Sequence, residues 1–240
     1  TNMMHTMASV AKAISAMSDE AEAGEIGAAA ARSAIMGARG NSGVILSQLL
    51  RGIGKGVAGK KTLNNTEIGK AFQFGILYAY RSVSKPVEGT ILTVARGMAK
   101  GAYNAVRGNV SLEAVLLEAI RSGKEELART PELLPALKAA GVVDAGGQGL
   151  IVFFEGCLAG LRGQDCEVLP VTPRAKGQIQ KGEPLDLEYP YCTEFIVKDA
   201  DVDKQTVSKA LEGMGNSMIV AVVEDIVKAV SYTHLTLPTI

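Results

Sequence analysis

A polar, glycine-rich turn opens an apolar helix in the stretch Gly37-Ala-Arg-Gly-Asn-Ser-Gly-Val-Ile-Leu-Ser-Gln48. The first turn of a helix has unpaired backbone N–H groups and a partial positive charge, so it attracts anions. Glycine lets a phosphate approach the backbone, and asparagine or serine adds hydrogen bonds. Three other segments share this design: Thr1-Asn2-Met3, Gly89-Thr90 and Asp144-Ala-Gly-Gly-Gln-Gly149.

On both sides of this stretch, from Met3 to about Gly163, apolar residues recur at helical spacing. Ser111 and the pair Thr130-Pro131 fit helix starts, and Gly141 fits a helix stop. The pattern predicts an all-α fold, an eight-helix antiparallel bundle or barrel in residues 1–163. The expected helices cover residues 3–17, 25–38, 43–57, 66–83, 90–106, a segment after 111, a short segment from 130 to 141, and 146–161.

Alternate helices of an antiparallel bundle begin at the same end, so the first, third and fifth helices should share one end. The eighth joins them only if the short seventh helix does not cross the bundle. Four glycine-lined helix starts would then form one phosphate-binding rim. A single such turn proves little, because helix capping alone explains most serine and asparagine residues at these positions.

The sequence changes character after Gly163. Four prolines and several charges indicate a linker over residues 164–190. Residues 191–230 then predict a strand, a helix and a strand, which we interpret as the truncated start of an α/β domain. The last segment, 231–240, fits no preceding pattern, and we expect it to be an artefactual tail outside the fold.

The composition argues against nucleic acid and membranes as partners of this chain. Lys plus Arg and Asp plus Glu number 25 each, so the chain has no broad field for nucleic acid. No apolar run approaches 18 residues, which argues against membrane insertion, and we expect a cytoplasmic protein. Hydrophobic residues make up 47% of the chain, as in ordinary folded domains.

Three motifs carry a family resemblance: Gly37–Gln48, Lys85-Pro-Val-Glu-Gly-Thr-Ile-Leu-Thr-Val-Ala-Arg96 and Gly141-Val-Val-Asp-Ala-Gly-Gly-Gln-Gly-Leu150. They resemble the dihydroxyacetone kinase L-subunit (DhaL) family, and within it the branch found in the bacterial fatty acid kinase catalytic protein. Tyr191-Cys-Thr-Glu-Phe-Ile-Val197 resembles the start of the middle domain in that branch. The resemblance implies an eight-helix barrel that binds ATP with magnesium at one end.

Carried over position by position, the resemblance implies a set of nucleotide-binding residues. In this alignment Lys138 stands where the family has an arginine, and Asp144-Ala-Gly146 stands where the family has an Asp-Pro-Gly turn. The set comprises Thr1, Asn2, Gly40, Asn41, Ser42, Gly89, Thr90, Lys138, Asp144 and Gly146.

The metal ligands are a departure from the family pattern. The family carries an Asp-Gly-Asp-Thr-Gly stretch immediately before Thr-Asn-Met, and its aspartates hold magnesium. This sequence begins at Thr1, so we expect no metal ligands in it, weak nucleotide binding and little catalysis. The intact parent is expected to be active.

Three functions compete. The resemblance favours an ATP-dependent kinase that phosphorylates a fatty acid carboxylate, presented by a fatty-acid-binding partner protein, to give an acyl phosphate. The alternatives are dihydroxyacetone (glycerone) kinase-type transfer and a non-catalytic helical interaction module whose glycines serve packing. No catalytic residue is assigned, because positioning and electrostatics can suffice in phosphoryl transfer.

Overall fold

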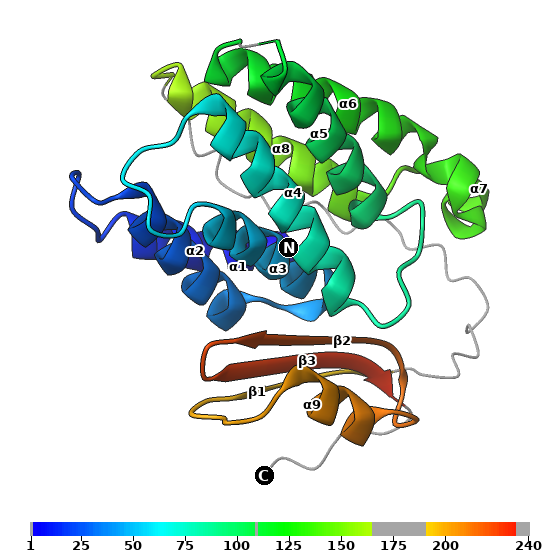
Figure 1. Cartoon of the computed structure of the whole chain (residues 1–240). Helices are drawn as coiled ribbons and strands as arrows, with labels where there is room; N and C mark the ends of the chain where they lie inside the picture. The colour runs from blue at the N-terminus through cyan, green and yellow to red at the C-terminus, as the bar shows by residue number, and fades with distance from the viewer. Residues whose placement is uncertain (1, 109, 165–190, 234–240) are drawn as a thin grey trace.

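The computed structural model describes residues 2–108, 110–164 and 191–233 (Figure 1). In the first two of these ranges the chain is helical, which confirms the predicted all-α class. The helices are α1 (Asn2–Ile14), α2 (Ala23–Gly37), α3 (Gly40–Gly56), α4 (Asn65–Ser82), α5 (Ile91–Val106), α6 (Leu112–Leu133), α7 (Pro135–Ala140) and α8 (Ala145–Leu161).

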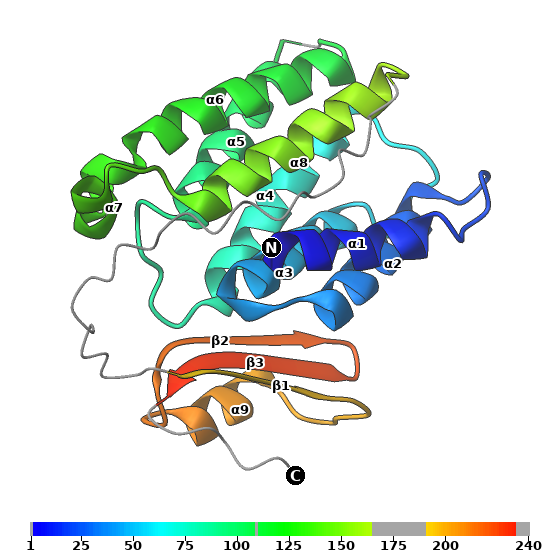
Figure 2. The ribbon, with the colours of Figure 1, turned by 180° about the vertical axis from the view of Figure 1, so that it is seen from behind.

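Helices that follow one another in the chain also pack side by side. Contacts run from α1 to α2, on to α3, α4, α5 and α6, and α8 packs against α5 and α6. The most buried helices are α3 and α5, whose Leu46, Val94 and Ala102 are fully buried. Figure 2 shows α8 beside α6 and α5, with α1 on the other side of the bundle from α6.

The boundary between α6 and α7 differs from the prediction. Thr130-Pro131 was expected to start a helix, but α6 continues through Pro131 to Leu133, and α7 begins at Pro135. A proline inside a helix leaves the carbonyl four residues earlier without its N–H partner. The buried Thr130 hydroxyl donates to that carbonyl, Leu127 O, at 2.7 Å, so the helix tolerates the proline. The predicted stop at Gly141 is confirmed by its left-handed φ of 65°.

A small sheet and one helix follow: β1 (Tyr191–Val197), α9 (Lys204–Leu211), β2 (Asn216–Val223) and β3 (Ile226–Thr233). The expected strand, helix and strand are present, but β3 was not predicted. It lies between β1 and β2 and pairs antiparallel with both. The prediction that the fold excludes residues 231–240 is therefore wrong for 231–233, because Tyr232 lies opposite Cys192 in the sheet. Residues 234–240, and the predicted linker apart from Gln164, lie outside the described residues.

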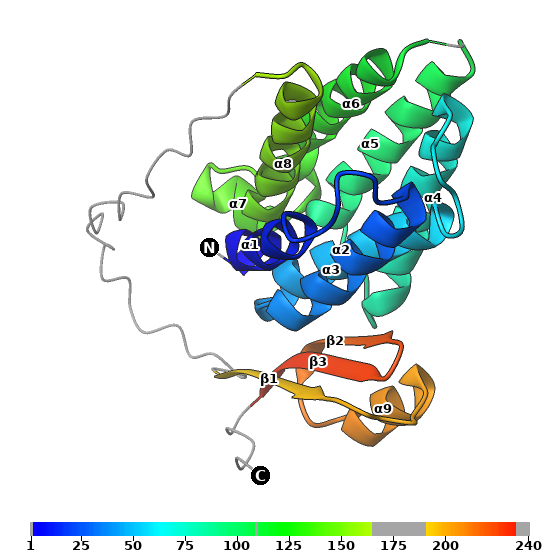
Figure 3. The same ribbon diagram turned by 90° about the vertical axis from the view of Figure 1, so that its left-hand side faces the viewer.

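The sheet lies between two layers of helix (Figures 1 and 3). One face contributes Ile219, Val223 and Ile226 to the core of the helical bundle, against α2, α3 and α4. The other face packs Val220 and Val227 against α9. Alternation along the strands therefore gives both faces an apolar partner, as period-2 side-chain geometry requires. Among the described residues, none of the helices has the length and apolar character needed to cross a bilayer.

Candidate functional site

Asp144 joins the starts of two helices. It is the N-cap of α8, and its carboxylate accepts a hydrogen bond from Gly147 N at 2.6 Å. Burial raises the pKa of the Asp144 carboxyl above its ordinary value, although the backbone N–H groups of Gly147, Ile91 and Gly146 favour the charged form. Ile91 is the first residue of α5, so the Asp144 carboxylate lies beside the starts of both α5 and α8. Asp144 N in turn donates to Thr130 Oγ1 at 3.1 Å, which ties the same turn to α6.

The first turn of α3 also lies beside the start of α8. A methyl group added at Gly146 would lie 3.3 Å from Ile91 Cβ and 3.6 Å from Ser42 Oγ. Ser42 is in the first turn of α3, so the starts of α3, α5 and α8 meet around Gly146. The short α7, at six residues, spans only about 9 Å and lets α8 begin at this end.

The start of α1 completes the group. A Cβ at Gly40 would lie 2.5 Å from the side-chain nitrogen Nδ2 of Asn2, and Gly40 has a φ of +55°. Both facts require glycine at this position, because other residues rarely adopt this φ and have a side chain to place. Thr6 donates to Asn2 O at 3.1 Å, and a Cβ at Gly43 would lie 2.9 Å from Thr6 Oγ1. The first turns of α1 and α3 are therefore in direct contact.

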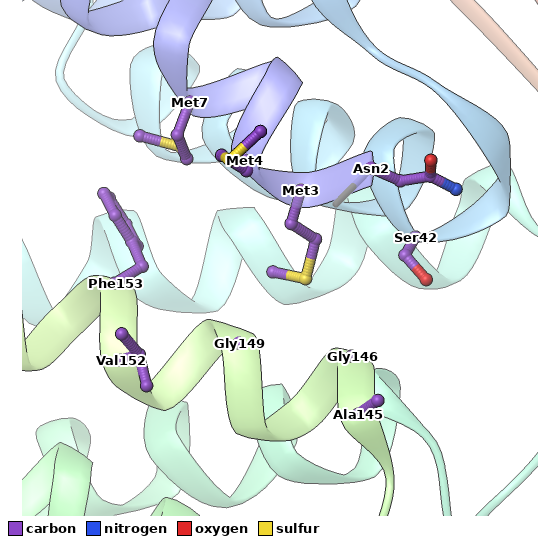
Figure 4. A pocket seen from close by; sticks show the side chains of 10 residues that line it. All are labelled: Asn2, Met3, Met4, Met7, Ser42, Ala145, Gly146, Gly149, Val152 and Phe153. Carbon is purple, nitrogen blue, oxygen red and sulfur yellow. The ribbon is translucent and has the colours of Figure 1, made fainter. Parts of the chain in front are cut away.

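A cavity of about 640 Å³ lies between α1 and α8 at this end of the bundle (Figure 4). Its polar end is formed by Asn2, Ser42, Ala145 and Gly146. An apolar wall continues from there along α1 and α8. It consists of Met3, Met4, Met7, Gly149, Val152 and Phe153, and the sequence interpretation missed it. The methionines recur at helical spacing, but only the packing of α1 opposite α8 distinguishes them from core residues.

Not every predicted residue lies at this cavity. The Asn41 side chain points instead to the sheet, where its Nδ2 donates to Ser217 O at 3.4 Å. Thr90 is the N-cap of α5, and Gly89 packs closely against the end of α6. Lys138 is exposed on α7 and does not line the cavity. Thr1 lies outside the described residues.

The donors at the polar end fit phosphate oxygens, since helix N-termini and a hydroxyl group meet there. They do not fit a magnesium ion. Magnesium prefers carboxylate ligands, and within 2–108, 110–164 and 191–233 no three His, Cys, Asp or Glu side chains form a metal-binding group. The Asp144 carboxylate beside Gly146 is directed to backbone N–H groups.

Comparison with known proteins identifies the helical part. Residues 1–159 match the DAK2 domain, the DhaL-type helical domain of kinases. The chain belongs to the DAK2 domain family. Residues 188–231 match the middle domain of FakA-like fatty acid kinase proteins, so this DAK2 domain is followed by the unit expected from Tyr191–Val197. The combination of these two domains places the chain in a kinase family related to fatty acid kinase.

Similar curated proteins extend over nearly the whole chain. Protein YloV of Bacillus subtilis is 39% identical over 241 residues, covering 95% of this chain and 43% of its own length. The uncharacterized protein SH1689 of Staphylococcus haemolyticus is 39% identical over 222 residues, covering 88% of this chain and 40% of its own. The chain therefore spans less than half the length of these relatives.

Proposed function

We propose that the DAK2 domain binds ATP with its phosphates at the polar end of the α1–α8 cavity and transfers a phosphoryl group. The observation that carries this proposal is the meeting of four helix starts around Gly146, Ser42 and Asn2. Each start supplies backbone N–H groups and a partial positive charge. Packing alone does not require three helix starts, those of α1, α3 and α8, to open onto one cavity.

We further propose a carboxylate as the acceptor, specifically that of a fatty acid carried by a lipid-binding partner protein. The match to a fatty acid kinase-type middle domain favours this acceptor over dihydroxyacetone. A second cavity, about 910 Å³, shares Asn2 with the first and is also lined by Gly40. Lys12 and Arg39 on its wall would favour an anionic acceptor, and the Glu194 carboxylate on the same wall lies 3.6 Å from the Arg39 guanidinium.

The chemical step is an in-line displacement. A carboxylate oxygen attacks the γ-phosphorus, the bond from that phosphorus to the β–γ bridging oxygen breaks, and ADP leaves. The chain's own contribution is to bind and orient the triphosphate and to place positive charge near it. Magnesium, when bound, neutralises phosphate charge, and we propose that its carboxylate ligands come from an Asp-Gly-Asp-Thr-Gly segment preceding Thr1.

ATP binding is expected to raise the melting temperature. At 100 times its dissociation constant, ATP with magnesium should stabilise the protein by about 2.7 kcal/mol, roughly 5–10 °C for a chain of this size. Differential scanning fluorimetry would compare the 240-residue chain with one preceded by Asp-Gly-Asp-Thr-Gly. We expect the larger shift in the extended chain. An unchanged melting temperature in both would contradict ATP binding and favour an interaction module.

The product separates the two acceptors in the full-length kinase. Hydroxylamine converts an acyl phosphate into a hydroxamate, whereas the phosphate ester of dihydroxyacetone does not react in this way. With ATP and a fatty-acid-loaded lipid carrier protein, we expect a fatty hydroxamate detectable by mass spectrometry. ADP formation with dihydroxyacetone alone, and no hydroxamate, would instead support glycerone kinase-type transfer.

A further inference from the structure

The sheet reaches back to the turn between α2 and α3, the turn that leads into the proposed phosphate site. Glu194 of β1 accepts a hydrogen bond from Gly40 N at 3.1 Å and lies 3.6 Å from the Arg39 guanidinium. Lys228 of β3 donates to Ala38 O. Asn41 donates to Ser217 O of β2 at 3.4 Å. Each of the consecutive residues 38, 39, 40 and 41 is thus held by one of the strands.

Apolar side chains of the sheet pack against the helical bundle and so fix the position of the strands that make these polar contacts. Ile219 and Val230, on the same face of the sheet as Lys228, are buried in the core of the helical bundle. Val83, at the end of α4, forms a bridge to Ile219, and Ser84 N donates to Met218 O at 3.3 Å. The sheet therefore packs against the bundle through its buried apolar residues. This packing holds its polar groups at a fixed position relative to the turn.

Lys228 is the unusual residue of this contact. It is only 2% exposed, although a lysine normally keeps its ammonium group in water. Burial lowers the pKa of Lys228, while the nearby Glu194 carboxylate acts in the opposite direction. An apolar residue would fill the same space without this cost. A buried ammonium directed at the Ala38 carbonyl instead fixes one peptide group, two residues before α3.

We propose that Lys228 and Glu194 are positioning residues, which hold the turn 38–41 so that the first turn of α3 stays open to phosphate. The phosphate site of the DAK2 domain is then built by both units of the chain. This inference rests on the proposed ATP site only for its functional consequence. The geometry of the turn is a separate property, which is measurable without any nucleotide.

Lys228→Met tests the inference, because methionine keeps the length and apolar stem of lysine but removes the donor. Lys198→Met is the matched control, since Lys198 is exposed just beyond β1. In the 240-residue chain without nucleotide, amide hydrogen exchange at Gly40 and Gly43, whose N–H groups donate to Glu194 and to Arg39 O, should accelerate about tenfold in Lys228→Met, the effect of losing one charged hydrogen bond. Lys198→Met should exchange like the parent, and both variants should keep the parent's melting temperature or exceed it.

A second pair separates geometry from charge at Glu194. Glu194→Gln keeps an oxygen that can accept from Gly40 N, so its exchange should match the parent; Glu194→Ala should accelerate exchange at the same amides. Isothermal calorimetry with ATP and magnesium should then show weaker binding in Lys228→Met and Glu194→Ala. Unchanged exchange in both would overturn the inference, as would weaker ATP binding without faster exchange. If the parent binds no ATP, the proposed function fails, and the exchange data alone decide the role of the two residues.

Discussion

Replacing Gly52 with alanine is expected to destabilise the protein by about 2–3 kcal/mol, near the upper end for inserting a methyl group into a packed core. The physical reason is a contact between backbones. A Cβ at Gly52 would lie 2.3 Å from Phe74 O and 2.6 Å from Gly75 Cα, which belong to the facing helix α4. Backbone atoms inside a helix cannot move aside unless α3 and α4 separate. The steric strain therefore cannot be relieved by a side-chain rearrangement.

Gly156→Ala provides the control for this substitution. Gly156 is also inside a helix, α8, but a Cβ there meets no atom within 4 Å. Alanine is favoured over glycine in a helix by about 1 kcal/mol, so this variant should be more stable than the parent. Urea denaturation would measure both changes. Equal effects of the two substitutions would contradict the close contact of α3 with α4.

Gly146→Val is expected to abolish the stabilisation by ATP, a loss of about 2.7 kcal/mol at 100 times the parent's dissociation constant. The helix starts of α3, α5 and α8 meet around this glycine. A Cβ there would already be 3.1 Å from Asp144 Oδ2 and 3.6 Å from Ser42 Oγ. The two γ-methyl groups of valine would fill the space through which a phosphate reaches the N–H groups.

The control is Gly160→Val on the same helix. A Cβ at Gly160 meets no atom within 4 Å, and the residue lies at the other end of α8, away from the cavity. Both variants replace a glycine of α8 by the same β-branched residue, so the change in helix propensity is shared. Fluorimetry with ATP and magnesium should give the parent's shift for Gly160→Val and none for Gly146→Val. An ATP-induced shift retained in Gly146→Val would exclude this end of the cavity as the phosphate site.

The sequence was most informative where local chemistry determines structure. Ser111, Thr90 and Asp144 were predicted at helix starts, and each is an N-cap whose side chain accepts a backbone hydrogen bond. Such contacts span two or three residues, so a short window of sequence contains both partners. The all-α class followed from helical periodicity for the same reason.

Features that depend on distant partners were not predictable in this way. The Pro131 position looks like a helix start until the Thr130 hydroxyl is seen to satisfy Leu127 O. Likewise, Asn41 looks like a phosphate ligand until Ser217 is placed beside it. The contacts of Glu194 and Lys228 with the turn join residues more than 150 positions apart, and no periodicity encodes them.

The strand order has a consequence for the synthesis of the protein. The central strand, β3, is the last of the three to leave the ribosome, and both β1 and β2 depend on it for their hydrogen-bonding partners. The helical bundle can begin to fold earlier, since domains generally fold in order from the N-terminus. Its turn at residues 38–41 therefore spends the interval of translation without Lys228. A nascent chain stalled before that residue would contain every helix of the bundle but not the finished geometry of the turn at residues 38–41.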